Sequence, residues 1–245
     1  MIILTWNILA SEWIKKSHYP GIDESVLFDY TARFSKISKK IKSINPDIIL
    51  LQEVMPREYD KLVSMLKAEY FISELKTITW QYNKDSESGN VTFLRRSMFS
   101  WLSIIHIPLE YGIYTQCVSN NQNYDIFNIH LDDQSCAKRH KQWGEIHSIT
   151  RKRNCVNIIG GDFNHQYKSN SKIYKVPGFT AHNTCPSYYI ERKMNIDNIL
   201  TRGLKKMVGG ACPLYPTNIE DGFKDYGSDH LPVVTNVYTT RHSLQ

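Results

Sequence analysis

The chain has 245 residues, of which 41% are hydrophobic and 22% are charged, and its formal net charge is +6. These values are typical of a globular protein with a sizeable core, and they exclude a disordered or collagen-like chain. No apolar run approaches the roughly 18 residues that a transmembrane helix needs, so we expect no membrane insertion. The excess of basic residues is compatible with a phosphate-bearing partner.

The cysteines and the amino terminus indicate in which cellular compartment the protein is expected. Five cysteines are widely spaced without a C-x-x-C pair, which predicts free thiols rather than a disulfide framework or a structural zinc site. The segment Met1–Leu4 is too short for the core of a signal peptide, and no basic stretch precedes it. We therefore expect a cytoplasmic or nuclear protein that is not secreted.

The first part of the chain alternates apolar runs with amphipathic stretches. Residues Ile2–Ile8 predict a strand, and Tyr30–Ser43 predict a helix, because apolar residues recur there every three or four positions. Asn45 precedes a proline and ends this helix. Ile48–Val54 is almost wholly apolar, as in a strand covered on both faces, and Pro56 begins a second helix.

The rest of the chain is predicted to be mostly strands. These are expected at Val91–Leu94, Trp101–Ile107, Ile113–Val118, Tyr124–Leu131, Val156–Ile159, Asn195–Leu200 and Leu231–Val237. A polar helix is expected at Cys136–Lys152, and a loop at Lys168–Tyr189. This order favours a mixed sheet, or two sheets, flanked by helices. No linker rich in glycine, serine or proline divides the chain, so we predict a single domain over residues 1–245.

Polar side chains recur where the predicted apolar strands begin or end. They are Asn7, Glu53, His130, Asp162, Asn164, Asp197, Asp229 and His230. Charged and amide groups are costly in such places unless they are paired or bind a metal ion. A single one is explained as a cap or turn residue, but so many in one chain indicate a shared site at one edge of a sheet.

The residue types fit the hydrolysis of a phosphodiester. Glu53 and Asp229 offer hard oxygen ligands, which suit Mg²⁺ or Mn²⁺ better than zinc. Asp162 is suited to orient or deprotonate an attacking water, with Asn164 positioning that water. Histidines donate hydrogen bonds to the non-bridging oxygens of a phosphate as charge builds in the transition state.

Six short blocks contain these residues: Thr5–Ile8, Leu51–Val54, Asn128–Leu131, Gly160–Asn164, Ile196–Ile199 and Gly227–Val233. In this order the blocks resemble the motifs of the endonuclease/exonuclease/phosphatase superfamily, also called DNase I-like. The blocks run from residue 5 to residue 233, so the resemblance extends over almost the whole chain. The resemblance implies an α/β (α+β) fold, a four-layer sandwich of two mixed β-sheets flanked by helices.

The resemblance also implies a metal side and a catalytic side of the site. Asn7 and Glu53 match the family's metal- and phosphate-binding pair, with Glu53 the chief ligand of Mg²⁺ (or Mn²⁺). Asp229 matches the acid near the metal. The catalytic residues matched are the water-activating pair Asp162 and Asn164, the phosphate-binding His230 with the Asp197 that orients it, and a second phosphate-contacting histidine, His130.

The branch of the superfamily is open. Abasic-site endonucleases usually have LQET and a tyrosine near the position of His130, whereas this chain has LQEV at Leu51–Val54. The segments Trp6–Ala10, Tyr19-Pro20 and Asn45–Ile49 are similar to the deadenylase and nocturnin-like branch. Residues Leu51–Pro56 also resemble 5′-tyrosyl-DNA phosphodiesterases. Those enzymes, however, have a T-W-D segment where residues 182–185 stand here.

Taken together, the sequence predicts a monomeric Mg²⁺-dependent phosphodiesterase, and specifically a nuclease. Water attacks phosphorus directly, and no covalent enzyme intermediate forms. Dispersed basic clusters are each typical of a solvated face, but collectively they suit an RNA or DNA backbone. The alternatives are a 5′-tyrosyl-DNA phosphodiesterase-like or deadenylase-like activity, a small-molecule or lipid phosphoesterase, and an inactive binding module on the same fold.

Overall fold

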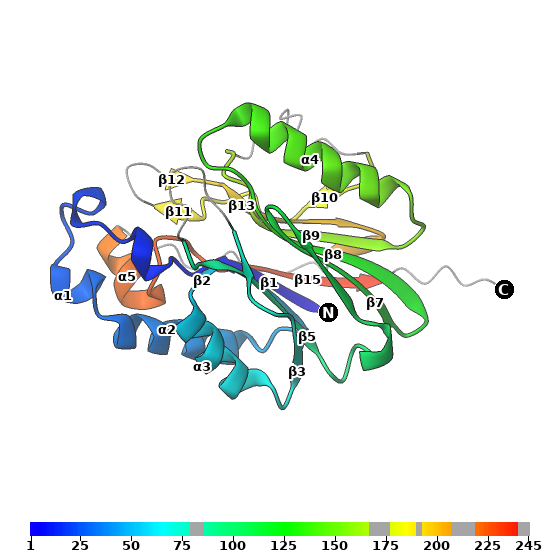
Figure 1. The fold of residues 1–245 in the computed structure, drawn as a ribbon, viewed down its shortest axis with the longest axis horizontal. Helices are drawn as coiled ribbons and strands as arrows, with labels where there is room; N and C mark the ends of the chain where they lie inside the picture. Colours follow the sequence, from blue (N-terminus) through cyan, green and yellow to red (C-terminus); the bar gives the residue numbers. More distant parts are fainter. Residues whose placement is uncertain (79–85, 167–176, 190–192, 207–218, 240–245) are drawn as a thin grey trace.

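Two mixed β-sheets pack face to face, with helices on both outer sides (Figure 1). The structure is a computed structural model that describes residues 1–78, 86–166, 177–189, 193–206 and 219–239. The first sheet has the order β14-β15-β1-β2-β5-β3, with β4 paired to β5. Its strands are β1 Ile2–Asn7, β2 Ile48–Val54, β3 Tyr70–Ile72, β4 Lys76–Thr77, β5 Gly89–Arg95, β14 Leu204–Lys206 and β15 Val233–Thr239.

The second sheet has the order β10-β13-β9-β8-β7-β6. Its strands are β6 Ile105–Leu109, β7 Gly112–Ser119, β8 Gln122–His130, β9 Val156–Asp162, β10 Thr180–Ala181 and β13 Asp197–Arg202, and a separate pair is formed by β11 Tyr188–Tyr189 and β12 Lys193–Met194. The helices are α1 Glu24–Leu27, α2 Tyr30–Ile44, α3 Pro56–Leu66, α4 Cys136–Arg151 and α5 Ile219–Tyr226, with 3-10 turns at Ser11–Trp13, Lys16–His18 and Trp101–Ser103.

Strand alternation sorts the apolar side chains into clusters that hold four layers together. Between the two sheets lie Ile3, Ile48, Leu50, Ile126, Ile158 and Ile199. The first sheet turns its other face to α2 and α3, where the cluster contains Leu4, Trp6, Ile37, Ile41, Ile49, Leu51 and Leu62. The second sheet packs against α4 through Phe127, Ile129, Trp143, Ile146 and Ile159. The predicted four-layer sandwich is therefore confirmed.

The strand directions bring the motif residues to one edge. Strand β1 runs parallel to β2, and β8 runs parallel to β9, so all four end at the same side. Strand β13 is antiparallel to β9 and begins there, with Asp197 opposite Asp162. Strand β15 is antiparallel to β1, so the residues just before it, Asp229 and His230, reach the same edge.

A buried amide network joins the two sheets beneath this edge. Gln52 Nε2 donates to Asn128 Oδ1 over 2.8 Å, and Asn90 Nδ2 donates to the same oxygen over 3.1 Å. Asn128 Nδ2 in turn donates to the Leu51 carbonyl over 3.1 Å. The three amide side chains are fully buried. Paired buried amides specify one arrangement of their neighbours, so this network fixes how the sheets sit relative to each other.

Two glycines allow the backbone to approach closely just before Asp162. A Cβ on Gly160 would lie 2.6 Å from Leu50 Cδ1 of the facing sheet. Gly161 has φ +153°, and a Cβ there would lie 1.9 Å from the Ile129 carbonyl oxygen. At Gly161 the close atom belongs to the backbone, so only glycine fits there, whereas at Gly160 the Leu50 side chain would have to shift.

The predicted strand at Trp101–Ile107 is partly wrong. Residues Trp101–Ser103 form a 3-10 turn, and the strand begins only at Ile105. Trp101 and Leu102 are 67% and 94% exposed, so their apolar character does not report burial in a sheet. An apolar run cannot by itself distinguish a strand from an exposed turn.

Cysteine chemistry departs from expectation at one position. Cys117, Cys136 and Cys155 are free, as predicted, but Cys185 is disulfide-bonded, and the prediction was wrong there. Among the residues that the structure describes, no helix combines the length and the apolar character needed to cross a bilayer.

Arg33 in α2 connects two loops that lead into the site, and its replacement tests this role. It is 4% exposed, and its guanidinium donates to the carbonyls of Gly227, Ile8 and Leu9 over 2.7, 3.1 and 2.6 Å. Arg33→Met leaves these buried acceptors unpaired and should lower the free energy of unfolding by about 2–4 kcal/mol, measured by urea denaturation. Lys39→Met on the exposed side of α2 should change it by less than about 0.5 kcal/mol. Equal effects of the two changes would contradict this role.

Candidate active site

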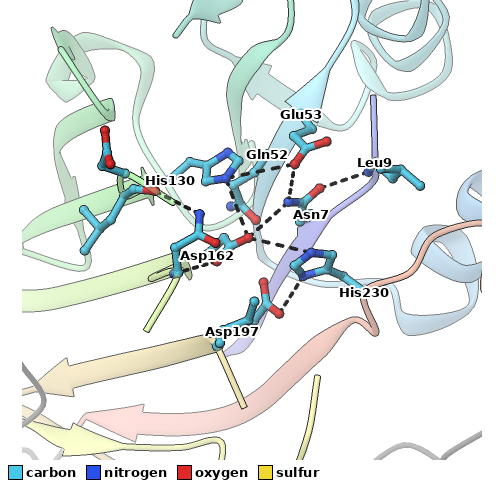
Figure 2. A network of polar contacts seen from close by, with 12 residues as sticks. Asn7, Leu9, Gln52, Glu53, His130, Asp162, Asp197 and His230 are labelled. Atoms are coloured by element: carbon cyan, nitrogen blue, oxygen red, sulfur yellow. Dashed lines mark hydrogen bonds and ion pairs between the residues drawn. The ribbon is translucent and has the colours of Figure 1, made fainter. Parts of the chain in front are cut away.

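A pocket of about 580 Å³ opens at the edge where the strands converge. Its lining includes six of the eight predicted residues: Glu53, His130, Asp162, Asn164, Asp229 and His230. Asn7 and Asp197 contact these residues from behind, through the hydrogen bonds drawn in Figure 2. The structure therefore brings all eight predicted residues together, from segments that lie far apart in the sequence.

Asn7 links carboxylates that come from different sheets. Its Nδ2 donates to Glu53 Oε1 over 2.7 Å and to Asp162 Oδ2 over 3.2 Å. The Leu9 backbone N–H donates to Asn7 Oδ1 over 3.0 Å, which fixes the amide with its nitrogen toward the carboxylates. The Ala10 N–H holds the other Glu53 oxygen, Oε2, over 2.9 Å. The carboxylate of Glu53 is thus held in a single orientation.

Glu53 also has an unusual backbone conformation. Its φ is +55°, in the left-handed region that residues other than glycine rarely adopt. The register between β2 and β5 shifts between Leu51 and Val54, so Glu53 lies in an irregular turn of the strand. Such irregularities redirect a side chain at the end of a strand, and they concentrate at functional sites.

Asp162 lies at the centre of the network. Its Oδ1 accepts the backbone N–H of Asn164 over 2.8 Å, and its Oδ2 accepts from Asn7. The Nε2 atoms of His130 and His230 lie 3.6 and 3.8 Å from the same Oδ2. Burial and the nearby Asp197 raise the pKa of Asp162 to about 8. Asp162 is therefore suited to accept a proton near neutral pH.

His230 and Asp197 form a buried pair. The imidazole Nδ1–H donates to Asp197 Oδ2 over 2.8 Å, and both side chains are at least 94% buried. Burial acts to lower the pKa of His230, but Asp197, Asp229 and Asp162 together hold it well above the ordinary value. The ring is therefore a cation whose Nε2–H points into the pocket toward Asp162.

His130 has the opposite protonation state. Burial and the positive charge of His230 lower its pKa to about 3. It is neutral at physiological pH and faces Glu53 and Asp162, with Nε2 4.0 Å from Glu53 Oε1. The two histidines of the pocket thus differ in charge, because the aspartates around His230 raise its pKa, whereas burial and the charge of His230 lower the pKa of His130.

The carboxylates fit a divalent cation. Burial and the neighbouring Asp229 raise the pKa of Glu53 to about 7, despite two hydrogen bonds that favour its charged form. Several buried carboxylates in one place disfavour one another unless a positive charge lies among them. Hard oxygen donors of this kind are those that Mg²⁺ and Mn²⁺ prefer. The donor set therefore suits such an ion beside Glu53 and Asp229.

A second group of ligand atoms is also compact. Single atoms of Asp162, Asp197 and His230 all lie within 4.8 Å of one another, which is close enough to hold a metal ion. In this group, however, Nδ1 of His230 is already bonded to Asp197. A cationic imidazole has no lone pair for a metal. The Glu53 side therefore offers donors better suited to an ion than this group does.

Sequence reasoning assigned no definite role to several residues that line the pocket. Tyr19 and Tyr188 line the pocket, and Tyr188 packs against His230 with ring centroids 4.7 Å apart. Leu9, Met194 and Ile196 supply apolar parts of the wall. None of them follows a strand in a recurring pattern. Tyr19 appeared only as part of a segment similar to deadenylases, with no role attached to it.

Comparison with known proteins bears on the family. Solved structures of similar fold include ANGEL2, a 2′,3′-cyclic phosphatase, in complex with adenosine-2′,3′-vanadate, with 17% identity, a TM-score of 0.75, and coverage of 96% of this chain and 94% of that chain. The human Nocturnin catalytic domain with bound sulfate has 17% identity and a TM-score of 0.68, covering 98% and 94%. These likenesses confirm the DNase I-like fold.

A further similar structure is D. rerio TDP2 complexed with a single-strand DNA product, with 14% identity, a TM-score of 0.66, and coverage of 98% of this chain and 99% of that chain. No curated protein matches the sequence. Residues 4–230 match the Endonuclease/Exonuclease/phosphatase family. This match includes every residue of the pocket network, and the chain belongs to the endonuclease/exonuclease/phosphatase family.

Proposed function

We propose that this protein is a divalent-cation-dependent phosphodiesterase that cleaves nucleic acid by direct attack of water. One observation carries the proposal. A proton-accepting carboxylate, Asp162, and a cationic imidazole, His230, face the same pocket, and a second group of carboxylates lies across from them. This arrangement suits a phosphate whose charge grows during reaction, because donors and a base are already in place.

Glu53 and Asp229 would hold Mg²⁺ or Mn²⁺. When bound, the ion neutralises charge on a phosphoryl oxygen and on the departing oxygen. Asn7 donates to Glu53 and keeps it oriented. Its Oδ1 accepts the Leu9 N–H and has a second lone pair that could serve the ion, so its place on the metal side of the site stays part of the proposal.

Asp162 orients the attacking water and accepts its proton at Oδ2. The Asn164 backbone N–H holds Oδ1, and the Asn164 side chain donates to the Leu131 carbonyl over 2.9 Å. The water oxygen bonds to phosphorus as the bond to the leaving oxygen breaks, which yields a phosphate monoester and a free hydroxyl. The leaving oxygen takes up a proton, and no covalent enzyme intermediate forms.

The two histidines stabilise the reacting phosphate. His230 donates from Nε2 as a cation, and Asp197 keeps that proton in place by holding Nδ1–H. His130 is neutral and offers a single N–H to a second non-bridging oxygen. Donors fixed in a buried site stabilise developing charge better than mobile water does.

A nucleic-acid substrate is favoured by charge and by the similar structures. The chain carries a net charge of +6, and the structures of ANGEL2 and TDP2 hold a nucleoside-2′,3′-vanadate and a single-strand DNA product. The pocket is open to polar substrate, with Lys15 and His18 on its wall. We further propose that the protein acts as a monomer in the cytoplasm or nucleus.

The test is a substrate panel with the purified full chain. It contains bis-p-nitrophenyl phosphate, single-stranded RNA with and without a poly(A) tail, a 2′,3′-cyclic phosphate end, abasic duplex DNA, a 5′-tyrosyl oligonucleotide and an inositol phosphate. We expect cleavage of at least one nucleic acid with Mg²⁺ and loss of activity in EDTA. Full activity in EDTA contradicts the metal mechanism. Cleavage of the inositol phosphate alone contradicts the nucleic-acid substrate.

A further inference from the structure

The segment between β1 and α2 forms a small core of its own. Leu9, Ile14, Tyr19, Ile22 and Leu27 are buried together with Phe223 of α5. Two 3-10 turns and the short helix α1 shape this segment, which is blue in Figure 1 and lies beside α5. The segment is therefore packed in place on α5, although its sequence shows no period of a helix or strand.

Tyr19 extends from this core to the pocket. Its ring packs edge-to-face on Phe223, with centroids 5.2 Å apart and planes at 81°. Its hydroxyl donates to Asp229 Oδ2 over 3.0 Å, and the residue is 3% exposed. The Tyr19 hydroxyl is therefore a donor that joins this core to the Asp229 carboxylate.

Asp229 has little else to hold its carboxylate. Among contacts between described residues, the other hydrogen bond to it is the long one from Ser228 Oγ to Oδ1, at 3.5 Å. The surrounding charges act in opposing directions, because Glu53 repels Asp229 whereas Arg33 and His230 attract it. Without Tyr19 the carboxylate has no short hydrogen bond to fix its rotamer.

We propose that Tyr19 is a positioning residue that holds Asp229 in the orientation that receives the divalent cation. The inference rests on the proposed function, since it requires Asp229 to lie on the ion side of the site. A carboxylate that is already oriented loses less conformational freedom when the ion arrives, so the ion binds more tightly. The phenol donates to Asp229 and not to the proposed base, Asp162, so its effect is on ion affinity rather than on the chemical step.

The test is Tyr19→Phe in the full chain, which keeps the ring on Phe223 and removes only the hydroxyl. The Mg²⁺ concentration for half-maximal activity should rise about tenfold, the scale of one lost hydrogen bond to a charged group. At saturating Mg²⁺, kcat should stay within about threefold of the unaltered protein, because the base and histidines are intact. Without substrate, the rise in Tm caused by subsaturating Mn²⁺ should be smaller in the variant.

Tyr70→Phe is the matched control. Tyr70 is equally buried and donates to the Pro46 carbonyl over 2.6 Å, far from the pocket lining. Loss of the Tyr70 hydroxyl should lower Tm and leave the Mg²⁺ concentration for half-maximal activity unchanged. A reciprocal check is Tyr19→Phe in an Asp229→Asn background, where the Mn²⁺-induced Tm shift should change no further, since Tyr19 acts through Asp229.

Two outcomes distinguish a failure of this inference from a failure of the proposed function. Unchanged ion dependence and an unchanged Tm shift in Tyr19→Phe, with an active unaltered protein, overturn the role of Tyr19 alone. If the unaltered protein shows no activity and no ion-induced Tm shift, both the proposed function and this inference are overturned. An equal rise in half-maximal Mg²⁺ concentration in Tyr70→Phe also overturns the inference, because the effect is then a general one on stability.

Discussion

Asp162→Asn is expected to lower kcat for phosphodiester hydrolysis by about 10³-fold, within the range for loss of a general base. The amide retains the shape of the side chain and can still receive the Asn164 N–H, so the fold should remain intact. It cannot accept the proton of the attacking water. The measurement is steady-state hydrolysis of a labelled oligonucleotide at saturating Mg²⁺, with circular dichroism to confirm folding.

Asp47→Asn provides the control for this change. Asp47 accepts the Ile2 N–H over 2.8 Å and pairs with Arg95 over 3.2 Å, away from the pocket lining. Its replacement should lower stability and leave kcat within about twofold of the unaltered protein, since surface pairs act on the fold and not on chemistry. If Asp162→Asn keeps more than about a tenth of the unaltered kcat, the assignment of Asp162 as base is wrong.

The second large effect concerns the His230–Asp197 pair. His230→Gln should lower kcat by about 10³-fold, and Asp197→Asn by about 10²-fold, the range for loss of one charge-stabilising donor or its support. The asparagine leaves Nδ1 of the imidazole without its anionic partner, so the pKa of His230 should fall toward the ordinary value. Activity of Asp197→Asn should therefore decline at high pH earlier than that of the unaltered protein.

The double variant distinguishes a shared role from two separate ones. Because Asp197 acts through His230, the pair of changes should cost about as much as His230→Gln alone, and not the product of both losses. His182→Gln is the control, since His182 is also buried and its ring nitrogens contact the hydroxyls of Thr201 and Thr235. That change should lower Tm but not kcat. Multiplicative losses in the double variant would contradict the positioning role of Asp197.

The candidate site could be predicted because its residues share a simple relation to the strands. Each predicted residue interrupts or ends an apolar run, and the parallel and antiparallel pairings bring those interruptions to one edge. The sequence could not indicate protonation states, however. His130 and His230 occupy similar strand ends, yet the aspartates around His230 raise its pKa, whereas burial and the charge of His230 lower the pKa of His130. Their individual chemical roles stay predictions until the variants above are measured.

Other features of the structure could not be predicted from the pattern of apolar runs. Tyr19 lies in a segment without periodicity, and its contact with Asp229 depends on packing against Phe223, more than 200 positions away in the sequence. Gln52 and Asn128 both lie in the sequence motifs, but their position between the sheets is set by tertiary packing. At Trp101 the opposite error occurred: its apolar character predicted a strand, but the residue lies in an exposed turn.

The amide network between the sheets has a consequence for how activity is lost. Glu53 comes from β2 of the first sheet and His230 lies just before β15 of that sheet, whereas His130, Asp162 and Asp197 come from the second. Each sheet keeps its own ladder of backbone hydrogen bonds if the two slide apart, whereas the pocket does not survive even a small displacement. The rate of catalysis should therefore respond to a change in the alignment of the two sheets before any spectroscopic signal of secondary structure does. Gln52 and Asn128, which never touch substrate, belong to the alignment on which turnover depends.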